Sequence, residues 1–135
     1  MSESDNPHEE LEVFREAISS AIDSTIYILI SGQEEGYFQI DPFSLGVSDQ
    51  TNADLTPQQR DVLKKELYNQ SGIIDGKLQA FDTYRTGEDG NLTVRIIEGT
   101  GLDDEGDVHI FYVHEIQHED GALDWQLSNS FNRLL

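Results

Sequence analysis

The sequence predicts an α+β fold in which two main helices pack on one face of an antiparallel sheet. Two helix-like segments, beginning near Pro7 and Thr56, carry apolar residues at spacings of three and four. The second half of the chain instead contains successive β-branched and apolar runs, separated by short turns rich in glycine and aspartate. Because strands follow one another without intervening helices there, an antiparallel meander is the expected sheet.

The first helix is predicted to begin at Pro7, because proline suits the first helical position. Residues 25–31 (TIYILIS) are β-branched and apolar, which predicts a strand. A hairpin with a second strand at Tyr37–Ile40 is expected across the glycine-bounded residues 32–36. The apolar stripe of the helix that begins at Pro7 comprises Leu11, Phe14, Ala17, Ile18, Ala21 and Ile22.

The second helix is predicted to begin with Thr56 as N-cap and Pro57 as first helical residue. Gly72 is expected to end it. Residues 43–55 predict a loop, or a loop with one short strand. The buried stripe of this helix comprises Val62, Leu63 and Leu67.

Three strands are predicted in the second half, at residues 78–86, 92–98 and 108–117. Their connections are a short turn at residues 87–91 and a longer one at 99–107. In the tail, Trp125 and Leu127 alternate like a strand, whereas the spacing of Leu127, Phe131 and Leu134 suits a helix. We expect a short strand followed by a helical end.

The length indicates a single domain over residues 1–135, with residues 1–6 expected to be disordered. The absence of cysteine favours a reducing compartment. There is no pattern of an export signal, and the longest apolar stretch, residues 26–30, is too short to span a bilayer. A cytoplasmic protein that does not enter a membrane is therefore expected.

Charge gives the strongest indication of function, since 27 Asp and Glu against 8 Lys and Arg leave a net charge of −19. Such an excess of carboxylates concentrates cations and repels anionic partners. Nucleic-acid binding is not expected, because phosphate contacts require Lys and Arg, and only Lys64 and Lys65 are adjacent. Cations are the first ligands to consider.

Calcium is the expected ion, because acidic turns with glycine supply the many oxygen ligands that it needs. The best segment is the turn that carries Asp103, Asp104, Glu105 and Asp107. Its glycine and glutamate positions do not fit an EF-hand loop. Asp41 is a further candidate, because it ends a strand and the following proline restrains it. The alternative is that the acidic turn is simply solvated. A cluster of Glu119, Asp120 and Asp124 is next in line.

No catalytic function is expected, since the chain lacks a GxSxG elbow, a phosphate-binding GxxxxGK[ST] loop and an HExxH motif. The spacing of His109, His114 and His118 also argues against a zinc site. His109 and His114 fall on opposite faces of a strand, and His114 and His118 lie about 13 Å apart. We expect ordinary histidines on a strand surface.

Residues 8–42 (HEELEVFREAISSAIDSTIYILISGQEEGYFQIDP) resemble the small acidic cyanobacterial calcium-binding proteins linked to heterocyst differentiation. The similarity continues through the run TYRTG at residues 83–87, and the length and charge also agree. The resemblance implies a calcium buffer or sensor of the cytoplasm that has no EF-hand and holds its ions with surface carboxylates.

Two other interpretations remain open. The order of elements and the low pI also resemble type III secretion chaperones, acidic dimers that bind a protein partner through apolar patches. Such a chaperone should be a stable dimer whose melting temperature does not respond to calcium. Alternatively, the acidic surface reflects adaptation to salt, and stability would then rise only at molar salt.

Overall fold

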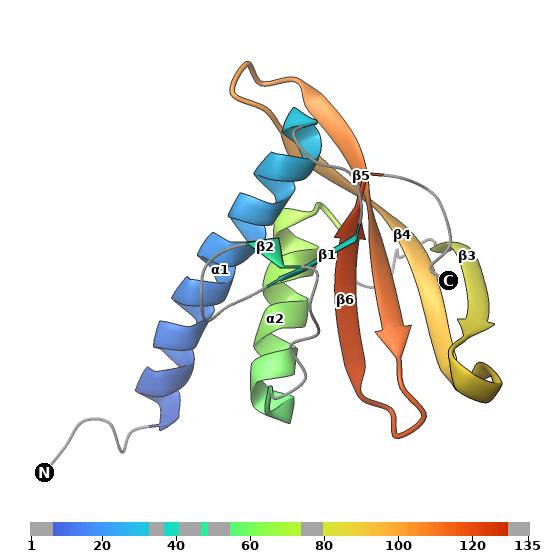
Figure 1. Ribbon diagram of the computed structural model, residues 1–135. Coiled ribbons are helices and arrows are strands. Elements are labelled where there is room, and N and C mark those ends of the chain that lie inside the picture. Colours follow the sequence, from blue (N-terminus) through green and yellow to red (C-terminus); the bar gives the residue numbers. More distant parts are fainter. Residues whose placement is uncertain (1–6, 33–36, 41–46, 49–54, 74–79, 130–135) are drawn as a thin grey trace, which may run out of the picture.

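The computed structural model describes residues 7–32, 37–40, 47–48, 55–73 and 80–129. It confirms the α+β class: two long helices lie on the same side of an antiparallel sheet (Figure 1). Helix α1 (Pro7–Ser31) packs against helix α2 (Pro57–Gln70) and against the sheet. Neither described helix has the apolar length that crossing a membrane requires.

The strands of the described chain form one sheet in the order β2-β1-β6-β5-β4-β3. Its main part is the expected meander of four longer strands, and two short strands extend it at one edge. All neighbouring pairs are antiparallel. The strands are β1 (Tyr37–Ile40), β2 (Val47–Ser48), β3 (Ala80–Thr86), β4 (Leu92–Leu102), β5 (Val108–Gln117) and β6 (Leu123–Ser128).

The strand and hairpin predicted at residues 25–31 are wrong, because α1 continues to Ser31. The apolar spacing of three and four extends through Thr25, Ile26 and Leu29, which are all buried. Thr25 is accommodated because its hydroxyl donates to the carbonyl of Ala21 at 2.8 Å. Burial of a continuous helix face therefore outweighs the β-propensity of the individual residues. Strand β1 exists but pairs with β6 and β2 instead.

Helix α2 confirms the predicted start. The Thr56 hydroxyl accepts from the backbone N–H of Gln59, whose side chain accepts in return from the backbone N–H of Thr56. Gly72 follows the helix with a φ of +71°, a conformation that favours glycine. The helix buries Leu63, Leu67 and Tyr68 against α1 and the sheet.

Strand β4 is longer than predicted, because residues 99–102 continue the pairing with β5. By residue type, Gly99 and Gly101 indicate a turn, but both lie in β4 at positions where a side chain would collide with the core. A Cβ at Gly99 would lie 2.9 Å from the Phe111 ring, and one at Gly101 would lie 2.8 Å from Cγ2 of Ile26. Gly99 leaves room for the Phe111 ring over strand β4, and Gly101 lets α1 approach this strand closely. The acidic connection shortens to residues 103–107.

Of the remaining predictions, some are confirmed and others concern residues outside the described ranges. Strand β5 has the predicted bounds, and β6 is the strand expected in the tail. Within residues 43–55, β2 is the short strand that one alternative foresaw. The predicted disorder of residues 1–6, the turn residues 33–36 and the helical end at residues 130–135 lie outside the described residues.

The sheet buries apolar side chains on both faces. The larger core lies between the helices and the sheet, and Phe111, Val113 and Leu127 contribute to it from the strands. The outer face, which is the face turned away from the helices, carries a second cluster of Tyr84, Val94, Ile96 and Ile116. His114 lies on this outer face and is fully buried, so the expectation of a surface histidine is wrong at that position.

Candidate functional site

The turns of the meander lie at two opposite ends of the sheet (Figure 1). The predicted acidic turn at residues 103–107, between β4 and β5, lies at one end. The β3–β4 turn, with a short 3₁₀ helix at Glu88–Gly90, lies at the other end together with the β5–β6 turn. Two of the three acidic turns therefore converge, whereas the predicted one is separate from them.

In the predicted turn, Asp103 organises the backbone. One oxygen of its carboxylate accepts from the backbone N–H groups of Glu105 and Asp107, both at 2.9 Å. The other oxygen lies 2.8 Å from Nε2 of His109. The hydrogen bond with His109 and those from the backbone hold the pKa of Asp103 below its usual value. Asp103 thus has a structural role in closing the hairpin.

The other carboxylates of this turn are exposed. Asp104, Glu105 and Asp107 make no ion pair with any described residue. Throughout the described ranges, no group of three or more His, Asp or Glu side chains is arranged to hold a metal ion. Asp41, the remaining predicted ligand, lies outside these ranges. The turn by itself therefore does not present a formed cage.

At the other end of the sheet, a polar hollow of about 460 Å³ lies between the two converging turns. Asp89 reaches it from the β3–β4 turn and Glu119 from the β5–β6 turn. Asn91, Thr93 and Gln117 add neutral side-chain oxygens to the lining. The two carboxylates that line this hollow come from connections about 30 residues apart, so sequence spacing alone did not reveal it.

Local structure at the hollow is well defined. Asp89 has a φ of +60°, the one positive value for a non-glycine residue in the described chain, and aspartate tolerates this conformation. Arg85 Nε donates a hydrogen bond of 2.7 Å to the carbonyl of Gly90, which stabilises the turn. Arg85 and His118 also line the hollow, and the positive charge of Arg85 opposes a bound cation.

The cluster of Glu119, Asp120 and Asp124 does not act as one group. Asp124 is buried and lies 2.6 Å from His118 Nε2, and Arg60 Nε approaches its other oxygen at 3.8 Å. Asp120 accepts from the backbone N–H of Ala122 within its own turn. Of the three carboxylates, only Glu119 lines the polar hollow.

A buried carboxylate that sequence reasoning missed lies beneath α2. Glu115 of β5 is 5% exposed and accepts hydrogen bonds from Tyr68 Oη, from Trp125 Nε1 at 3.0 Å and from Arg95 Nε at 3.1 Å. Burial by itself would raise the pKa of Glu115, but these hydrogen bonds outweigh it and lower the pKa. An acidic residue inside an otherwise apolar strand was the available signal.

No protein-family model, no curated protein and no solved structure matches this chain. The resemblance of residues 8–42 to cyanobacterial calcium-binding proteins therefore stays a prediction.

Proposed function

We propose that this protein binds calcium with moderate to low affinity and acts as a buffer or sensor of calcium in the cytoplasm. One observation carries the proposal: two acidic turns, distant in sequence, bring Asp89 and Glu119 to the same oxygen-lined hollow. Calcium favours carboxylate, amide and hydroxyl oxygens in flexible arrangements of six to eight ligands. The net charge of −19 raises the local concentration of divalent cations around every such turn.

The expected affinity follows from the charges at the hollow. Two carboxylates face it, and Arg85 partly offsets them. Calcium-sensing EF-hands bring more carboxylates to one preorganised loop. We therefore expect a dissociation constant of about 10 µM to 1 mM, from the weak limit of calcium sensors to the range of extracellular modules. The exposed acids of the 103–107 turn would add weaker binding.

The test is a calorimetric titration of calcium into chelator-treated protein at near-physiological salt, with magnesium as competitor. The double variant Asp89→Asn, Glu119→Gln should bind calcium about tenfold more weakly or worse, because each carboxylate contributes a charge-assisted contact. The double variant Asp104→Asn, Asp107→Asn should weaken binding by less than about threefold. Far-ultraviolet circular dichroism checks that each variant is folded.

A matched control is Glu10→Gln with Glu16→Gln, which removes two exposed charges from α1, a helix that contributes no residue to the lining of the polar hollow. It should bind calcium like the parent. Equal affinities for all three double variants would show that the acids act only as a diffuse field. Added salt would then erase the binding as it screens that field.

A second candidate function, an interaction module, is favoured by one feature of the β4–β5 hairpin. Leu102, Val108 and Ile110 are each more than half exposed beside the acidic turn. Leu102 pairs directly with Val108, so the two side chains form one apolar surface. A protein segment with apolar and basic side chains would complement it. A stable complex with such a segment, together with a melting temperature that ignores calcium, would favour this function over calcium binding.

A further inference from the structure

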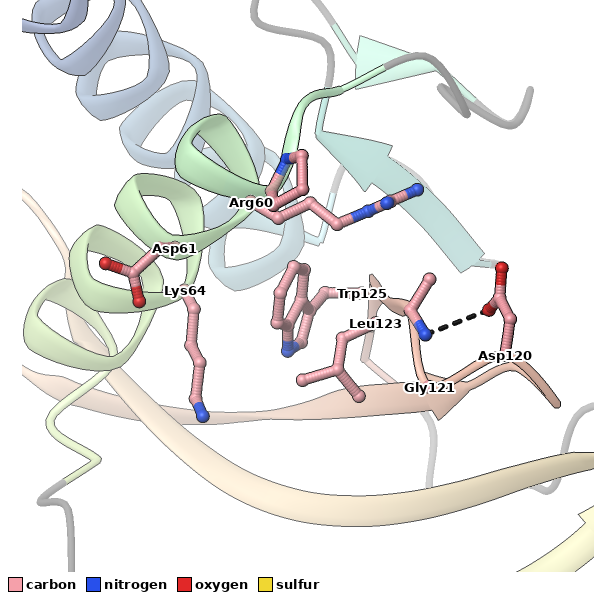
Figure 2. A pocket seen from close by; sticks show the side chains of 9 residues that line it. Arg60, Asp61, Lys64, Asp120, Gly121, Leu123 and Trp125 are labelled. Carbon is pink, nitrogen blue, oxygen red and sulfur yellow. Dashed lines mark hydrogen bonds between the residues drawn. The ribbon is translucent and has the colours of Figure 1, made fainter.

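A second hollow, of about 500 Å³, lies between α2 and the β5–β6 turn. It falls within the usual size range of small-molecule sites. Helix α2 contributes Pro57, Arg60 and Lys64 to its lining, and the strand side contributes Leu123 and Trp125. Figure 2 shows the indole of Trp125 between the side chains of Arg60 and Lys64, with Leu123 beside it.

This hollow is lined by two basic and two acidic side chains. Arg60 and Lys64 are two of only 8 basic residues, and their spacing of four places both on one face of α2. Two carboxylates also line the hollow, each with a local partner, and Arg60 Nε in turn lies 3.8 Å from an oxygen of the buried Asp124. Asp61 lies 3.1 Å from the ammonium group of Lys65, and Asp120 accepts from the backbone N–H of Ala122 at 3.0 Å.

The floor of the hollow is apolar and rigid. Trp125 is 3% exposed, and its indole N–H donates to the buried Glu115, which fixes the orientation of the ring. Leu123 is partly exposed and extends the apolar surface toward the turn. An apolar floor between two cations suits a ligand that has an apolar body and an anionic group.

The charge of the whole chain decides which anion fits best. At −19, the surrounding field repels every additional negative charge of a ligand, so a dianionic phosphate ester is penalised more than a monoanion. A carboxylate carries a single charge and matches the guanidinium of an arginine in a bidentate geometry. We propose that this hollow binds a small monocarboxylate with an apolar body.

The test uses intrinsic fluorescence, because Trp125 is the one tryptophan of the chain and forms the floor of the hollow. Cyclohexanecarboxylate is the probe, since it does not absorb where tryptophan is excited. Its addition should change the fluorescence saturably, with a dissociation constant of about 1 mM for a ligand of this size. Cyclohexanecarboxamide, acetate and inorganic phosphate should give at least about tenfold weaker responses.

Variants assign the binding to the two cations. Arg60→Gln and Lys64→Gln should each weaken binding of the probe about tenfold. Arg15→Gln makes the same charge change as Arg60→Gln on an exposed part of α1 and should leave binding unchanged. Lys64→Gln removes no ion pair within the described residues, so it remains informative if Arg60→Gln destabilises the fold.

The proposal is overturned if saturation is absent at about ten times the expected dissociation constant. It is equally overturned if the neutral amide binds as tightly as the carboxylate, or if both cation variants bind like the parent. Calcium binding does not enter this test, because the probe is titrated in the presence of a chelator.

Discussion

Replacement of Glu115 by alanine should lower the free energy of unfolding by about 3–5 kcal/mol, or the melting temperature by roughly 10–20 °C. The carboxylate is buried and receives hydrogen bonds from Tyr68, Trp125 and Arg95. Its removal takes the acceptor from a buried hydroxyl and a buried indole N–H, and it leaves the partly buried Arg95 without its ion pair. Urea unfolding followed by circular dichroism measures the change.

Glu98→Ala is the matched control, because Glu98 lies on the adjacent strand β4 and is exposed. Its replacement should change the free energy of unfolding by less than about 0.5 kcal/mol. If both variants lost the same small amount, the network around Glu115 would be unimportant for stability.

The Glu115 network should also give a characteristic dependence on pH. The pKa of Glu115 is lower in the folded protein than the value of about 4.3 expected when unfolded. The unfolded state therefore takes up the proton first as pH falls. The stability from this group is present above about pH 4.3 and is lost as pH falls through the lower folded pKa.

Glu115→Gln removes this contribution but keeps the size of the side chain. The stability difference between parent and variant should be constant near neutrality and shrink below about pH 4. Relief of the general repulsion among carboxylates stabilises both proteins alike as pH falls, so the difference isolates Glu115. A difference that stays constant to about pH 2 would contradict the assigned network.

Tyr27→Pro should cost about 3 kcal/mol or more, because it places proline in the interior of α1. Proline removes a helical hydrogen bond and collides with the preceding turn. The side chain of Tyr27 is 45% exposed, so most of the loss arises in the backbone. Thermal unfolding measures the loss, and helical circular dichroism should decrease as the end of α1 unwinds.

Tyr27→Ala separates the backbone effect from the loss of the side chain. In a helix, the high propensity of alanine offsets part of the lost contact, so the net cost should stay below about 1 kcal/mol. In a strand, alanine would be unfavourable relative to tyrosine. A cost of Tyr27→Ala as large as that of Tyr27→Pro would argue against the helical conformation of residues 25–31.

Features that depend on residues close together in the chain could be predicted from the sequence alone. Thr56, Pro57 and Gly72 marked the ends of α2 because capping and positive φ are properties of single residues. Strand β5 was predicted with its observed bounds, since its run of apolar residues has turn residues on both sides. The fold class followed from the order of such elements along the chain.

Where the local preference of a segment competed with packing, contacts with the rest of the fold determined its conformation. Residues 25–31 prefer strand by composition, but burial of Thr25, Ile26 and Leu29 on a continuing helix face determined their conformation. Gly99 and Gly101 indicate a turn by residue type, yet the close approach of Phe111 and Ile26 made them part of β4.

The candidate sites also required the tertiary structure. The hydrogen bonds to Glu115 join residues 10, 20 and 47 positions away, and Asp89 and Glu119 line one hollow from two separate turns. Pairing of β3 with β4 and of β5 with β6 brings those turns to the same end of the sheet. Composition indicated carboxylates as the candidate cation ligands. Which of them lie together depends on strand register, and register is set by contacts between segments that are distant in the sequence.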